Sequence, residues 1–225
     1  GQGLLSFHRK DSERLKNALQ EATLQVTQTV AFAARESYTR AYQHLLKLHV
    51  LSDLSWLAEC REAQSPTPGG LAPVLLARCA AAAPAFSAQQ TLLSPARVAL
   101  LEMDLVEDAK HVELAFVRLC RKNNVPVAME VPAASFGATS PDLLMRAQIE
   151  WGKLLYVRGS RHDALRHMQE QAARYPKARL LGTRWATEAS SELLLPKIAE
   201  AEFKEAKERL PEYEAAWFYH ASYLD

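Results

Sequence analysis

Apolar residues recur at helical spacing along most of the chain. Between Asp11 and Ala33 they form one stripe of a long helix, at Leu15, Leu19, Ala22, Val26 and Val30. From about Glu36 to Glu59 they form a second stripe, at Tyr38, Ala41, Leu45, Leu48, Leu51 and Leu54. Two amphipathic helices joined by a short connection favour an antiparallel pair. The pattern therefore predicts a long helical hairpin over residues 1–60.

The middle of the chain is interrupted by helix-breaking residues. The stretch REAQSPTPGG at 61–70 is typical of a loop, and residues 61–93 are predicted as this loop and a short helix that stops near Pro84. Ser94 and Pro95 have the pattern of an N-cap with proline at the first helical position. They are predicted to open a set of irregular helical repeats over residues 94–140, in which Pro126 and Pro132 allow only a short or kinked helix.

Residues 141–225 repeat with a period of about 34. Trp151, Trp185 and Trp217 are 34 and 32 residues apart, and Pro176 precedes Pro211 by 35. Gly152 and Ala164 are small residues where two close-packed helices need them, and Pro176 ends the first unit. This arrangement resembles tetratricopeptide repeats. The predicted fold class is all-α, an α-α superhelix of tetratricopeptide/HEAT-like helical hairpins, with the three tryptophans in its core.

Composition supports helix and disfavours several functions. Only eight glycines and eleven prolines interrupt a chain rich in Ala, Leu, Glu, Arg and Gln. The 27 basic and 26 acidic residues are interspersed, giving a net charge of +1, which argues against direct nucleic-acid binding. The three widely spaced cysteines, Cys60, Cys79 and Cys120, fit neither a metal site nor a disulfide framework. With no apolar stretch of membrane-spanning length and no signal-peptide-like start, an intracellular chain is expected.

Catalytic patterns are missing from the sequence. It contains no glycine-rich phosphate loop, no GxSxG elbow and no HExxH helix, and its histidine pairs are five residues apart, which does not place them on one helix face. We therefore expect no catalytic, cofactor-binding or metal-binding residues in this segment. Helical repeats usually present a surface to a protein partner, so scaffolding is the default function.

Six segments resemble the FAT region of phosphatidylinositol 3-kinase-related protein kinases. They are LLSFHRKDSERLKNAL at 4–19, ESYTRAYQHLLKLHVLSDL at 36–54, AFVRLCRKNN at 115–124, AQIEWGKLLYVRGSRHDALRHMQE at 147–170, KARLLGTRWATEAS at 177–190 and YEAAWFYHASYLD at 213–225. The segments at 115–124 and 213–225 most resemble ATR-type DNA-damage checkpoint kinases, with the ATM-type and mTOR-type kinases as near competitors. Phe116 departs from the resemblance, since the family often has Trp there.

The resemblance implies a non-catalytic segment of a large nuclear serine/threonine kinase. In such kinases the FAT helices clamp the kinase domain and contact a regulatory subunit or a homodimer partner. ATP and Mg²⁺ would then belong to the kinase domain of the parent, and neither nucleic acid nor membrane would be a direct partner.

Two other functions remain open on the sequence. A free-standing tetratricopeptide-like adaptor would grip a peptide with polar residues of a first helix, for which Arg146, Gln148 and Lys153 are available. An enzyme with an unrecognised site would need a deep pocket with perturbed titratable groups.

The last predicted helix has more apolar surface than one neighbour can cover. Trp217, Phe218 and Tyr219 are consecutive, so their side chains spread around well over half of a helix. Phe218 and Tyr219 are therefore the candidate interaction surface, through which the isolated chain is expected to associate with itself or with a companion chain.

Overall fold

The computed structural model describes residues 12–63, 70–125, 140–189 and 196–224. Ten helices and no strand occur in these described residues. Helices adjacent in sequence pack against one another, as in a superhelix of hairpins. The predicted all-α fold class is therefore confirmed. The segment with Pro126 and Pro132 lies outside the described residues.

The chain divides into two compact units, Gly1–Glu130 and Val131–Asp225. Unit 1 contains α2 (Ser12–Glu36), α3 (Tyr38–Ala63), α4 (Ala72–Ala81), α5 (Phe86–Glu102) and α6 (Val106–Lys122). Unit 2 contains α7 (Pro141–Val157), α8 (Arg161–Ala172), α9 (Pro176–Ala189), α10 (Pro196–Arg209) and α11 (Glu214–Leu224).

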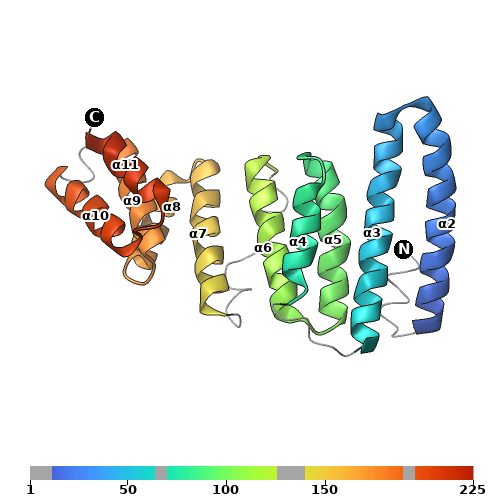
Figure 1. Ribbon diagram of the computed structural model, residues 1–225. Coiled ribbons are helices and arrows are strands. Elements are labelled where there is room, and N and C mark those ends of the chain that lie inside the picture. The colour runs from blue at the N-terminus through green and yellow to red at the C-terminus, as the bar shows by residue number, and fades with distance from the viewer. Residues whose placement is uncertain (1–11, 64–69, 126–139, 190–195, 225) are drawn as a thin grey trace. The chain divides into compact units, whose positions relative to one another are not determined.

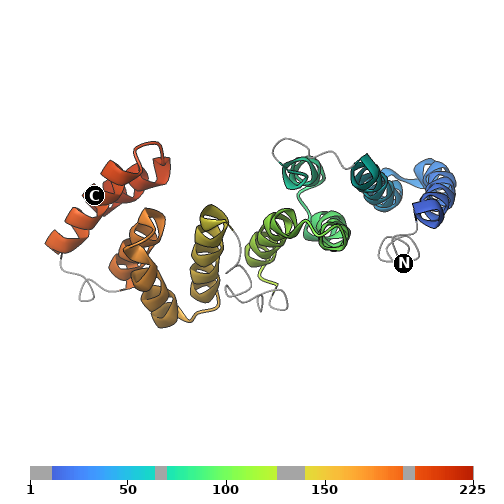
Figure 2. The ribbon, with the colours of Figure 1, turned by 90° about the horizontal axis from the view of Figure 1, so that it is seen from below.

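Helices α2 and α3 form the long antiparallel hairpin of unit 1 and lie side by side in both ribbon views (Figures 1 and 2). The predicted inner stripe of α2 is partly or fully buried, with Leu15 0% and Leu19 4% exposed. The α3 residues that are fully buried are Ala41, Leu46, Asp53, Leu54, Leu57 and Ala58. Because α3 also packs on α5, α2 is the outermost of the described helices of unit 1 (Figure 1).

A side-chain cap fixes the start of α4 against α6. The Ala72 backbone N–H donates a hydrogen bond to Oδ1 of Asp108, with 2.9 Å between the two atoms. Gly70 precedes this cap with φ of +82°, and a Cβ atom there would lie 2.6 Å from the same Asp108 oxygen. Both the left-handed backbone and the close approach therefore require glycine at residue 70.

The prediction that Ser94 and Pro95 begin a helix is wrong. Helix α5 starts eight residues earlier, at Phe86, and Pro95 lies inside it. A proline in a helix interior loses one backbone hydrogen bond and normally ends the helix. Here Ala88, Leu92 and Leu93 are 2%, 5% and 3% exposed, so burial of the turn before Pro95 outweighs that loss.

In unit 2 each helix packs on its neighbour in sequence, and small residues allow the close contacts. A Cβ atom at Gly152 of α7 would lie 2.2 Å from Cε of Met168 on α8. Ala164 and Met168 are both fully buried. Gly152 and Ala164 therefore set the separation of α7 and α8, and Pro176 is the first residue of α9.

Candidate functional site

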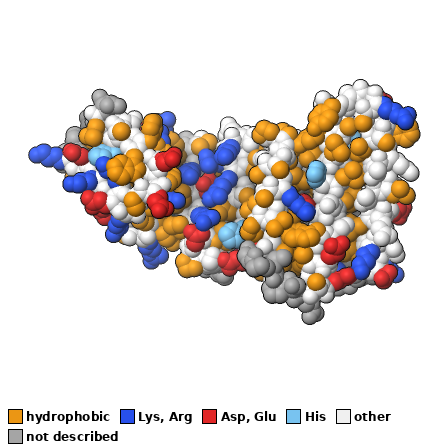
Figure 3. Space-filling view, viewed as in Figure 1, with side chains coloured by type: hydrophobic (Ala, Val, Ile, Leu, Met, Phe, Trp, Pro, Cys, Tyr) orange, Lys and Arg blue, Asp and Glu red, His pale blue; other side chains and the backbone are white. Residues whose placement is uncertain are grey.

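Helix α11 is apolar on every side. Its inner side, including Ala216 and Tyr223, packs with Leu180 and Phe203 on α9 and α10. On its outer side Trp217, Phe218 and Leu224 are 53%, 67% and 61% exposed. Apolar side chains are correspondingly visible on the surface around α11, at the left of Figure 3. A helix that is apolar all round is normally buried, so the outer side of α11 has the character of a contact surface.

The three tryptophans that the sequence predicts in the core differ in how deeply they are buried. Trp185 is 6% exposed, and Trp151 is partly buried. The prediction that Trp217 lies in the core is wrong. Its indole Nε1–H donates to the carbonyl oxygen of Pro211 at 3.1 Å, and Lys207 Nζ lies 4.8 Å from the ring centroid. These two contacts hold the ring over the turn between α10 and α11.

A groove of about 280 Å³ lies beside this exposed surface. Its lining comes from α9, α10 and α11 and consists of Arg184, Thr187, Glu188, Phe203, Phe218, Tyr219, Ser222 and Tyr223. The rings of Phe218 and Tyr219 meet edge to face, with centroids 5.9 Å apart. The two predicted interaction residues therefore form one wall of a groove, with Phe218 the more exposed of the pair.

The α9 residues that line the groove are joined by charged and aromatic contacts to the neighbouring helices. The Arg184 guanidinium lies over the Tyr219 ring at 4.3 Å, and Arg184 Nε donates to Glu188 Oε1 at 2.6 Å. The Tyr156 hydroxyl donates to the other Glu188 oxygen at 3.1 Å. Burial raises the pKa of Tyr156, and Glu188 raises it further. Residues of α7, α9 and α11 are thereby joined in one chain of contacts.

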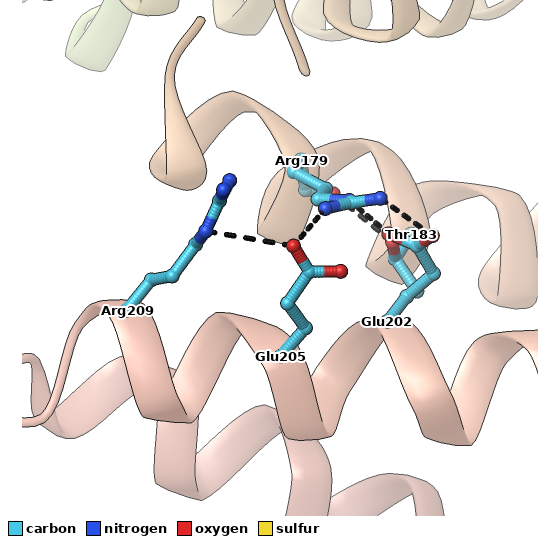
Figure 4. Close-up of polar contacts among 5 residues, drawn as sticks. All are labelled: Arg179, Thr183, Glu202, Glu205 and Arg209. Carbon is cyan, nitrogen blue, oxygen red and sulfur yellow. Dashed lines mark hydrogen bonds and ion pairs between the residues drawn. The ribbon is translucent and has the colours of Figure 1, made fainter. Parts of the chain in front are cut away.

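An ion-pair network holds α9 against α10 (Figure 4). Arg179 contacts both carboxylate oxygens of Glu202 and also the carboxylate of Glu205. Arg209 Nε lies 3.5 Å from Glu205, and the Thr183 hydroxyl donates to the Arg179 carbonyl at 3.0 Å. The bidentate contacts of Arg179 therefore hold α9 against α10, and α10 carries Phe203, one of the residues that line the groove.

A comparison with protein-family models matches residues 2–215 to the FAT domain. This chain belongs to the FAT domain family. No match was found among curated proteins or among solved structures. The matched range of the FAT domain ends inside α11, so Trp217, Phe218 and Leu224 follow it.

Two of the three residues that a peptide-binding adaptor would use, Arg146 and Lys153, form ion pairs within this FAT domain. Arg146 pairs with Asp142 at 2.8 Å, and Lys153 pairs with Glu150 at 3.0 Å. The contact that involves Gln148 is made by its backbone oxygen, which lies 3.0 Å from Nε2 of His167, and not by its side chain. These contacts leave Arg146 and Lys153 with their charges already balanced.

Three further features concern metal binding, membrane insertion and thiol reactivity in the described part of the FAT domain. Among those residues no group of three or more His, Cys, Asp or Glu side chains is placed to hold a metal ion. None of the described helices is long and apolar enough to cross a membrane. Burial raises the pKa of the Cys60, Cys79 and Cys120 thiols, which favours their unreactive protonated form.

The sequence pattern indicated the exposed aromatic side chain of Phe218 in α11 but did not indicate the contacts on the rest of the groove. Arg184 and Glu188 are four residues apart on one helix, a spacing that indicates an ion pair from sequence alone. Tyr156 is 32 residues from Glu188, and no local pattern connects them. The exposed aromatic side chain of Phe218 on α11 and the ion pair on α9 are therefore predictable from the sequence, whereas the hydrogen bond from Tyr156 to Glu188 is not.

Proposed function

We propose that this FAT domain is the helical scaffold of a large nuclear serine/threonine kinase of the ATR type, acting in DNA-damage checkpoint signalling. In this proposal it clamps the kinase domain of its own polypeptide and contacts regulatory partners. ATP and Mg²⁺ would bind the kinase domain of the parent. Family membership supports the scaffold role, and the resemblance of residues 115–124 and 213–225 to ATR-type kinases supports the subtype.

The observation that carries the proposal is the outer surface of α11. Trp217, Phe218 and Leu224 are more than half exposed beside a groove. Apolar anchors of this kind, bordered by polar groups, are typical of the centre of a protein interface. The free-standing adaptor is not favoured, since Arg146 and Lys153 are paired within α7.

The test uses the full-length protein and a separately produced carboxyl-terminal part that begins after residue 225. Binding of the 225-residue FAT domain to that part is measured by calorimetry, and phosphorylation of a Ser/Thr peptide is measured with the full-length protein. We expect binding that Phe218→Asp weakens about tenfold or more, the effect of losing an interface anchor. The helical circular dichroism of the variant should be unchanged, because Phe218 is 67% exposed.

Val157→Asp is the matched control, since Val157 is an exposed apolar residue of α7, 46% exposed and away from the groove lining. Equal binding by wild type and Phe218→Asp would contradict the role of α11. A full-length protein without kinase activity would contradict the assignment to a kinase. Saturable binding of Mg-ATP to the FAT domain itself would show a nucleotide site in this segment.

A further inference from the structure

Helix α2 carries a second stripe of side chains, apart from the inner stripe that packs on α3. Phe32, at the edge of this second stripe, also lines a surface groove with Thr39 and Arg40 of α3. Glu21, Leu24, Gln28, Phe32 and Arg35 are all exposed and fall within roughly 80° of arc at 3.6 residues per turn. Leu24 is 62% and Phe32 is 70% exposed. We call these five residues the outer stripe. In the described part of unit 1, α2 is the outermost helix, and its packing partner is α3 (Figure 1).

The surface around the outer stripe has the composition of an interface. The sequence contains no charged residue from Ala22 to Ala34. The exposed positions there are Thr, Gln, Ala, Leu and Phe, whereas a solvated helix face is normally rich in Lys and Glu. Depletion of charge together with exposed Leu and Phe side chains is typical of the core of a protein interface.

The outer stripe is also complementary to itself. Leu24 and Phe32 lie four residues before and after Gln28, and Glu21 and Arg35 lie seven before and after it. Two α2 helices that cross antiparallel at Gln28 would therefore place Leu24 of each copy against Phe32 of the other. The same crossing places the Glu21 carboxylate of each copy against the Arg35 guanidinium of the other.

We propose that the outer stripe of α2 is a twofold, self-pairing surface whose occupant is α2 of a second copy of this chain. In such an isologous contact each residue i meets j and each j meets i, so every favourable pair occurs twice. The contact is apolar at its centre and carries opposite charges at both ends, which fixes the antiparallel register. Arg35 already lies 6.0 Å from the Phe32 ring centroid, so it is positioned at the edge of the apolar centre.

Exchanging the charges of Glu21 and Arg35 in the 225-residue chain tests the antiparallel register of the two α2 helices. Sedimentation equilibrium up to about 100 μM detects a weak dimer. We expect Glu21→Arg and Arg35→Glu each to weaken dimerisation about tenfold, because each brings two like-charged pairs together. The double variant Glu21→Arg/Arg35→Glu should return to near the wild-type dissociation constant. A wild type that stays monomeric, or a double variant no tighter than the single ones, would overturn the proposal.

Apolar and crosslinking variants test the surface independently. Phe32→Glu should weaken dimerisation about tenfold, whereas Val106→Glu, at a 51% exposed position of α6, should not. Gln28→Cys should give a disulfide-linked dimer under mild oxidation, since residue 28 lies on the twofold axis. Ala34→Cys, on another side of α2, is its control. Loss of the dimer with Phe218→Asp but not with Phe32→Glu would assign self-association to α11 and overturn the proposal.

Discussion

The ring of Tyr156 lies flat against the ring of Trp185, with centroids 4.3 Å apart and planes 14° apart. Tyr156 lies in the last turn of α7, and Trp185 lies within α9, so the stack joins helices from successive hairpins. The Arg161 guanidinium also lies over the Tyr156 ring, 5.7 Å from its centroid. Because Tyr156 also donates to Glu188, the stack supports the charged wall of the groove beside α11.

Trp185 should contribute strongly to the stability of unit 2. Replacing it with Ala removes the stack and leaves a cavity, at a cost of about 3 to 5 kcal/mol in the free energy of unfolding. Trp217→Ala is the matched control, because the 53% exposed Trp217 ring loses only surface contacts. We expect about 1 kcal/mol for that variant. Similar losses for the two variants in urea denaturation would contradict this difference between the rings.

Gly152→Ala should destabilise the α7–α8 hairpin by about 1 to 3 kcal/mol, the usual cost of overpacking. The new methyl group would collide with Cε of Met168, the flexible end of a buried side chain. Combining the change with Met168→Leu, which removes that atom, should recover part of the loss in a double-mutant cycle. Additive losses in the cycle would show that Met168 is not the atom in conflict.

Arg179→Met should cost about 1 to 2 kcal/mol, because it leaves Glu202 and Glu205 without their shared partner. Arg179→Lys should recover only part of the loss, since an ammonium group cannot reproduce the bidentate contact of the guanidinium with the Glu202 carboxylate. Arg166→Met provides the comparison, because the Arg166–Asp163 pair is 64% and 52% exposed and should contribute little. If thermal melts show equal losses for Arg179→Met and Arg166→Met, the network does not stabilise the α9–α10 contact.

His220 should make unit 2 less stable in mild acid. Burial lowers the pKa of His220 and Lys207 lowers it further, while Glu200 acts in the opposite direction. Its ring stacks near Phe203 at 6.1 Å, and its Nε2 atom is buried without a hydrogen-bond partner. The folded-state pKa is thus below the unfolded value of about 6.5. The stabilising contribution is therefore present above that pH and is lost as the pH falls.

The measurement is urea denaturation of wild type and His220→Phe at pH 7.5 and pH 5.5. The phenyl ring keeps the contact with Phe203 and does not titrate. We expect the free energy of unfolding to fall further for wild type than for the variant, with the other histidines contributing equally to both. Parallel decreases would mean that His220 has the same pKa in the folded and unfolded chains.

The sequence by itself determined the helical class and the hairpin at the start of the chain. Leu15 and Leu19 repeat at helical spacing, and the structure buries both, because amphipathic periodicity alone decides which side of a helix must leave water. It also indicated that Phe218 is left exposed, since three consecutive aromatic residues cannot face one neighbour. The family resemblance was readable from short segments, and the FAT match covers residues 2–215.

Only the tertiary structure decided where local rules are overruled and which distant groups meet. Pro95 carries a strong helix-start signal, yet burial of Leu92 and Leu93 extends α5 through it. Trp217 keeps the repeat period but turns outward, because the Pro211 carbonyl and Lys207 hold it over a turn. Tyr156 and Glu188 are 32 residues apart, and their hydrogen bond exists only because α7 and α9 are brought together. Periodicity is a property of one helix, whereas these outcomes depend on contacts between helices.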